Sequence, residues 1–135
     1  MAYSSYRVRD VLLQREKVLA ATAATDPIDL GILTANGSRL EEYEIRLWAE
    51  ASLVAVLPAN KSATYTIQFA DTPDFEADVD EYTSNLWKQT GSADGAPEME
   101  AFFRVPTKTK RYVRLNGVTN SAGTPTARFG FEILG

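Results

Sequence analysis

Six stretches of the chain alternate apolar and polar residues with a period of two, the pattern of a β-strand that buries one face. In the first stretch Ile45 and Leu47 share one face, and Trp48 points to the other. Residues 82–89 and a segment ending at Gly31 bring the expected number of strands to about eight. The six stretches are residues 43–49, 52–57, 64–70, 99–105, 111–118 and 128–134.

Loops rich in Gly, Pro, Asn and Asp separate these stretches, and such residues supply the backbone angles that turns require. Short strands joined by frequent turns predict an all-β fold, an antiparallel β-sandwich of the jelly-roll or immunoglobulin-like kind. The chain has 135 residues, of which 44% are hydrophobic, and this suits one folded unit. We therefore expect a single β-sandwich domain over residues 1–135.

The first thirty residues do not follow the alternation. The spacing of Val8, Val11 and Leu12 is near that of a helix, but an extended strand fits the segment as well, because Pro27 disfavours a helix just before it. We expect an N-terminal arm over residues 1–16, or a short helix, followed by a strand. The arm mixes aromatic, arginine and aliphatic side chains, as interfaces do. Its predicted interface residues are Tyr3, Tyr6, Arg7, Arg9, Leu12 and Leu13.

The composition excludes several kinds of chemistry. The chain has no cysteine and no histidine, which excludes disulfides, thiolate nucleophiles, imidazole bases and nearly every zinc site. No glycine-rich phosphate-binding motif is present. No apolar run approaches the ~20 residues of a membrane helix, and the N-terminus lacks the apolar core of a signal peptide. We expect a soluble protein made in a cytosol, with no metal, no cofactor and no membrane contact.

Charge is segregated along the chain, whose net charge is −4. Residues 71–81 contain six acids, whereas residues 101–135 contain six bases and one acid. The acidic stretch lacks the glycine and glutamate of an EF-hand loop, and we interpret it as a solvated turn around Pro73. A catalytic carboxylate pair such as Asp74 and Glu98 remains an alternative. Nucleic-acid binding is not expected, because the domain as a whole is acidic.

The two tryptophans and the basic hairpin are further candidates for contacts. Trp48 and Trp87 are either covered by a loop or placed in an interface between subunits. We expect part of the basic hairpin to pair with the acidic stretch, and the rest to reach a neighbouring subunit or another partner. Its predicted interface residues are Arg104, Arg111, Tyr112 and Arg114.

Three segments, in order, resemble the jelly-roll capsid cement (decoration) proteins of tailed bacteriophages. Residues 21–31 are similar to a strand entering an "IDLG" element, residues 66–76 to a strand ending in an aspartate-rich turn, and residues 102–127 to an "FR.P....RY.RL" hairpin. The resemblance implies a jelly roll of about eight strands. It also implies a homotrimer without catalytic activity on the outer surface of a virion.

The partner that this resemblance implies is the major capsid protein of a phage shell. The expected function is non-enzymatic: the protein binds the assembled capsid and stabilises it after synthesis in the bacterial host cytoplasm. The alternative is a carbohydrate- or receptor-binding β-sandwich of a phage virion, in which exposed Trp48 and Trp87 stack on sugar rings.

Overall fold

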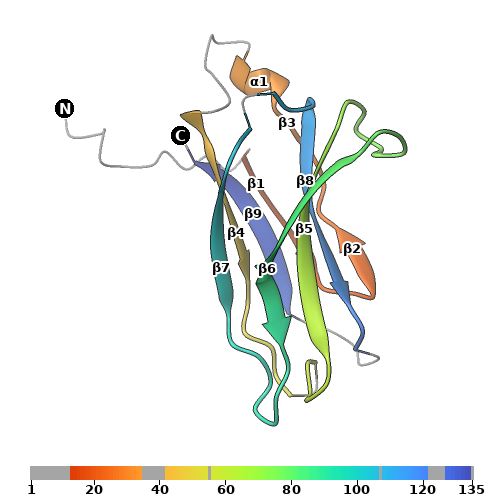
Figure 1. Cartoon of the computed structure of the whole chain (residues 1–135), viewed down its shortest axis with the longest axis vertical. Helices are drawn as coiled ribbons and strands as arrows, with labels where there is room; N and C mark the ends of the chain where they lie inside the picture. Colours follow the sequence, from red (N-terminus) through yellow and green to blue (C-terminus); the bar gives the residue numbers. More distant parts are fainter. Residues whose placement is uncertain (1–12, 35–41, 55, 107, 122–126, 135) are drawn as a thin grey trace, which may run out of the picture.

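The computed structural model describes residues 13–34, 42–54, 56–106, 108–121 and 127–134. Two antiparallel sheets face each other as a sandwich (Figure 1). One sheet has the strand order β1-β9-β4-β7, and the other has the order β2-β8-β5-β6, with β3 also paired to β8. The strands are β1 (Gln14–Val18), β2 (Thr22–Ala24), β3 (Ile28–Asp29), β4 (Glu44–Ala49), β5 (Ser62–Ala70), β6 (Asp80–Thr90), β7 (Met99–Arg104), β8 (Tyr112–Thr119) and β9 (Arg128–Leu134), and the helix is α1 (Gly31–Thr34).

The strand pairing is nested: the first strand pairs with the last, and later strands pair with partners progressively nearer in sequence. β1 pairs with β9, β2 and β3 with β8, β4 with β7, and β5 with β6, all antiparallel. This nested pairing, divided between two sheets, is the topology of a jelly roll, in which β2 and β3 together take the place of one strand. The structure therefore confirms the predicted all-β jelly-roll sandwich.

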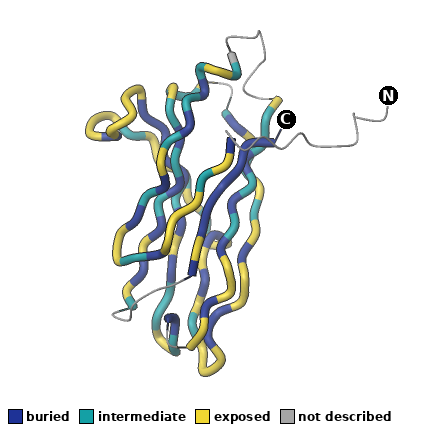
Figure 2. Tube along the Cα trace, turned by 180° about the vertical axis from the view of Figure 1, so that it is seen from behind, coloured by how far each residue is buried: buried dark blue, intermediate teal, exposed yellow. Residues whose placement is uncertain are grey.

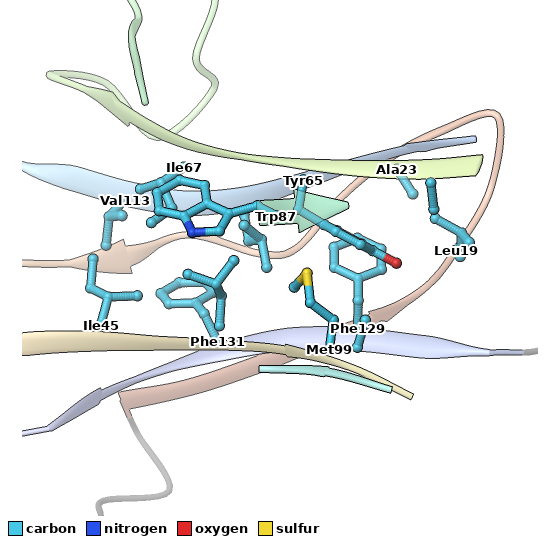
Figure 3. Close-up of a cluster of buried hydrophobic side chains, with 14 of the residues drawn as sticks. Leu19, Ala23, Ile45, Tyr65, Ile67, Trp87, Met99, Val113, Phe129 and Phe131 are labelled. Carbon is cyan, nitrogen blue, oxygen red and sulfur yellow. The ribbon is translucent and has the colours of Figure 1, made fainter. Parts of the chain in front are cut away.

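The core lies between the two sheets and is built from the apolar sets that the alternation predicts (Figure 3). Phe129 and Phe131 of β9 face Tyr65 and Ile67 of β5, and all four side chains are almost fully buried. The Tyr65 and Phe129 ring centroids lie 5.3 Å apart. The Tyr65 hydroxyl donates to the Gln89 side-chain oxygen at 2.6 Å, so this buried polar group is satisfied.

The open edge between β6 and β7 is filled by aromatic side chains. Trp87 of β6 lies edge-to-face against Phe103 of β7 with centroids 5.7 Å apart, and Tyr82 lies 5.1 Å from the same ring. Burial alternates along most strands, as the coloured trace shows (Figure 2). These contacts place Trp87 in the core, where its exposure is 7%.

Two expectations about local structure need correction. Residues 52–57 were expected to form a strand, but Val56 and Leu57 donate backbone hydrogen bonds to the Leu53 carbonyl, which makes a turn. The expected arm over residues 1–16 extends too far, because β1 begins at Gln14 and pairs with β9. The sequence allowed either a helix or a strand in the first thirty residues. In the described part of this segment, β1 and β2 are strands.

Candidate binding surfaces

Trp48 lies on the outer face of the β1-β9-β4-β7 sheet, as the alternation along β4 predicts. Its neighbours Leu47 and Ala49 point into the core, and Trp48 itself is half-buried. In the next strand it is paired with Gly130. A Cβ atom added at Gly130 would lie 2.8 Å from Trp48 Cζ2 and 3.0 Å from Cε2, so the indole covers the missing side chain.

Two hollows open beside Trp48. One has a volume of about 320 Å³ and lies toward β1, where Gln14, Glu16 and Glu132 line it together with Trp48. The other has a volume of about 310 Å³ and lies toward β7 and the loop before it. Its lining includes Trp48 again, with Arg46, Glu50, Glu98 and Glu100. The indole therefore separates two hollows, each of which has charged side chains in its lining.

Ion pairs hold three of the five carboxylates that line these hollows. Arg46 Nε donates to Glu100 at 2.6 Å, and Arg46 Nη1 lies 3.4 Å from Glu132, whose exposure is only 5%. Arg128 Nη1 lies 3.2 Å from Glu16. Two guanidinium groups therefore hold three carboxylates beside one aromatic side chain.

A second surface is the end of the sandwich where β4 leads to β5 and β6 leads to β7 (bottom of Figure 1). Leu53 and Val54 are 73% and 47% exposed there. Ser52 and Ala96 exchange two backbone hydrogen bonds of 2.9 Å, which tie the two loops together. Gly95, with φ of +88°, allows the close approach, since a Cβ there would lie 2.1 Å from the Ser52 carbonyl oxygen. Two aliphatic side chains thus stand on a firmly held turn.

Part of the outer face of the β2-β8-β5-β6 sheet, around Gln68 and Arg114, is covered by the acidic loop between β5 and β6. Phe75 of this loop is 7% exposed, and the Arg114 guanidinium lies 4.2 Å from its ring centroid. Arg114 Nε donates to Gln68 Oε1 at 2.7 Å, and Gln68 Nε2 donates to Glu81 Oε2 at 2.8 Å. Burial lowers the pKa of Arg114, and the Glu81 carboxylate opposes this shift. Arg114 thus reaches the acidic stretch through Gln68 rather than by a direct ion pair, while Lys110 Nζ lies 3.7 Å from Asp80 of that stretch.

Arg111 makes a different pair. Its Nε and Nη2 atoms each lie 2.9 Å from one oxygen of Asp29, in the two-pronged geometry that suits a guanidinium and a carboxylate. The hydrogen bond from Arg111 holds the pKa of Asp29 below its usual range. Arg111 also lies over the Tyr112 ring at 5.2 Å. Arg104 is exposed on β7, opposite Glu44 of β4 in the sheet register.

The remaining predicted interface residues fall into two groups. Leu13 and Trp87 belong to the core, with exposures of 9% and 7%, so neither presents an open surface. The others lie outside the described residues: Tyr3, Tyr6, Arg7, Arg9 and Leu12. The pattern analysis missed Leu53 and Val54, because an apolar run next to a turn reads as a strand. It also missed Gly130. A glycine between the strand residues Phe129 and Phe131 was the signal that could have found it.

Residues 71–79 of the acidic stretch form a surface loop, and Asp80 and Glu81 begin β6. Asp71, Asp74, Asp78 and Asp80 are exposed, and the Asp74 carboxylate accepts bonds from the Thr72 hydroxyl and a backbone N–H. No group of three or more acidic residues that could hold a metal ion is found among the described residues. Within the same residues, no helix is long and apolar enough to cross a membrane.

Comparisons with known proteins give little further information. No protein-family model and no curated protein sequence matches the chain. A solved structure that is similar is that of the Clostridium thermocellum N-terminal endo-1,4-beta-D-xylanase 10B, CBM22-1-GH10 modules complexed with xylohexaose. The identity is 10% and the TM-score 0.46, over 96% of this chain and 28% of that chain. At this level the similarity carries no argument about fold or function.

Proposed function

We propose that the chain is a non-enzymatic structural protein that binds an assembled phage capsid and stabilises it as a cement protein. The observation that carries this proposal is the rigid apolar end of the jelly roll. Leu53 and Val54 are exposed on a turn that is tied to the neighbouring loop by the Ser52–Ala96 hydrogen bonds. A preorganised apolar contact loses little conformational entropy on binding, which is what an adhesive surface requires.

The fold and the resemblance of residues 21–31, 66–76 and 102–127 to cement proteins support the same proposal. A jelly roll offers a stable body with an adhesive end. The mechanism is mass action: a protein that binds the assembled shell and not free capsid subunits stabilises assembly by about 2.7 kcal/mol at a hundredfold excess over Kd. The partner is the major capsid protein, and the bound form is a homotrimer on the outside of the virion.

The capsid contact is tested with shells assembled from the major capsid protein encoded beside this chain. Leu53→Asp puts a charge into the proposed contact and should weaken binding to shells by about tenfold or more. Leu86→Asp is the matched control, because Leu86 is 81% exposed on β6 and lies outside this end. Binding is measured by co-sedimentation with shells.

Several results would contradict the proposal. One is wild-type protein that stays in the supernatant; another is Leu53→Asp binding as well as Leu86→Asp. A genome with no capsid gene near this one would also count against it. The trimer is tested separately by light scattering, and a monomer at tens of micromolar would contradict that part.

A further inference from the structure

We propose that the outer face of the β1-β9-β4-β7 sheet binds a neutral, extended oligosaccharide, with the Trp48 indole as the platform on which a sugar ring stacks. This site lies on a sheet face, whereas the capsid contact proposed above lies at the end of the sandwich. The two proposals are independent, and either one stands if the other fails.

The first step of the argument is the position of the indole. Its six-membered ring lies over Gly130, where a Cβ atom would come within 2.8 Å of Cζ2. An aromatic ring that rests on the sheet turns its other face outward, and Trp48 is half-buried rather than covered. The ring is held in place because Gly130 leaves room for it. A fixed aromatic face with a solvent-facing side is the apolar half of an amphipathic binding site.

The second step is the pair of hollows. They have volumes of about 320 and 310 Å³, and Trp48 lines both. Glu16, Gly130, Trp48 and Glu100 form one row across the four strands, so the hollows lie on either side of the indole across the sheet. An extended chain of sugars fits this arrangement, with one ring on the indole and a neighbour in each hollow.

The third step is the charge around the ring. Arg46 pairs with Glu100 and Glu132, and Arg128 pairs with Glu16, so three of the five carboxylates that line the hollows are held in ion pairs. An anionic ligand would have to break these pairs to reach Arg46 or Arg128. Neutral hydroxyl groups need not, because they donate to carboxylate oxygens and accept from guanidinium groups already held in place.

The same residues argue against a protein as the occupant. The centre of a protein–protein interface is depleted of charged residues. Here five carboxylates and two guanidinium groups line the hollows beside Trp48, and Glu98 and Glu100 are exposed in the hollow toward β7. A partner protein would have to remove these charges from water around a single aromatic side chain.

The experiment uses the full chain with cellohexaose, a neutral extended hexasaccharide, and maltohexaose, which coils. Calorimetry should give a Kd for cellohexaose of about 1 mM or below, and weaker binding for maltohexaose. Because Trp48 and Trp87 are the two tryptophans and Trp87 is 7% exposed, acrylamide quenching reports on Trp48. Cellohexaose should reduce that quenching.

Trp48→Ala should weaken cellohexaose binding by about tenfold or more, and Trp48→Tyr, which keeps a ring, by less. Phe102→Ala is the matched control: Phe102 is 50% exposed on the same sheet face but lines neither hollow, so binding should stay within about twofold. Thermal melting of each variant shows whether the fold is kept, and Trp48→Tyr carries the test if Trp48→Ala unfolds.

Four results would overturn the proposal. They are no binding of cellohexaose at about 10 mM, equal binding by the wild type and both Trp48 variants, equal loss in Phe102→Ala, and preference for maltohexaose. A change of oligomeric state in Trp48→Tyr would likewise overturn it, because the face would then be covered by a second copy of the chain.

Discussion

The outer faces of the two sheets differ in how far other segments of the chain cover them. On the β2-β8-β5-β6 sheet, the loop between β5 and β6 folds back against β8. Phe75 of this loop is 7% exposed, and its ring centroid lies 4.2 Å from Arg114 Cζ. Under this cover the outward-pointing Gln68 is only 8% exposed. On the β1-β9-β4-β7 sheet, Trp48 is half-buried between two hollows, and Phe102 is 50% exposed.

The difference shows that residue type at an outward position does not decide its burial. Gln68 is buried because the loop after β5 covers this part of its sheet, whereas Phe102 on the outer face of the other sheet is half exposed. The covering loop has a conformational cost. Phe75 has a φ of +55° and Asp78 a φ of +53°, a backbone region that bulky residues rarely adopt. The burial of the Phe75 ring and its contact with Arg114 offset that cost.

The largest expected effect comes from filling the gap on the open face. In Gly130→Ala the new Cβ would lie 2.3 Å from the Arg15 carbonyl oxygen, so β1 or β9 must move as well as the indole. We expect a loss of about 3 kcal/mol in the free energy of unfolding, measured by urea denaturation. Val18→Ala, at an exposed position of β1, is the control and should change it by about 0.5 kcal/mol or less. An unchanged midpoint in Gly130→Ala would mean that the indole and β1 are loosely held.

Removing one phenylalanine from each outer face compares the two directly. Phe75→Ala should lower the free energy of unfolding by about 2 kcal/mol, less than for a core phenylalanine because the ring lies outside the inter-sheet core. Phe102→Ala should change it by about 0.5 kcal/mol or less, because half of that side chain is already in solvent. Both are measured by urea denaturation. Equal losses would show that the two faces are covered alike.

Arg114 lies on β8 and contacts Phe75 of the covering loop, so replacing it measures how much this contact stabilises the fold. Arg114→Ala removes the 2.7 Å bond to Gln68 and uncovers the Phe75 ring, so we expect a loss of about 1 to 1.5 kcal/mol in thermal or urea unfolding. Arg128→Ala on the other face breaks an exposed ion pair and should cost about 0.5 kcal/mol or less. If the two variants lose the same stability, the chain of bonds from Arg114 to Glu81 adds nothing beyond a surface ion pair.

The smallest effect concerns the exposed pair of Asp29 and Arg111. The hydrogen bond from Arg111 lowers the pKa of Asp29 from its usual value of 3.8. The pair therefore stabilises the fold above that value and loses its contribution as the pH falls through the lowered pKa. The difference in unfolding free energy between wild type and Asp29→Asn should be measurable near neutral pH, at about 1 kcal/mol or less, and should shrink as the pH falls through the lowered pKa of Asp29. A difference that is larger in acid would contradict this assignment.

The sequence alone predicted most of the sandwich. The alternation along residues 64–70 and 128–134 placed Tyr65, Phe129 and Phe131 on buried faces, where the structure finds them. The reason is that the side-chain period of a strand is two, so one register decides every inward residue at once. In residues 52–57 the apolar pattern predicted a strand, but the described residues of this segment form a turn.

Local pattern also determined that Trp48 points away from Ile45 and Leu47, and that residues 71–79 of the acidic stretch form a surface loop. Only the tertiary structure decided which outward faces remain open. Trp87 is buried against Phe103 because β6 and β7, which belong to different sheets, meet at one edge. Trp48 keeps an outward face because Gly130, 82 residues further along the chain, lies beneath it. Burial of an outward side chain depends on segments far away in sequence, and no local period encodes their positions.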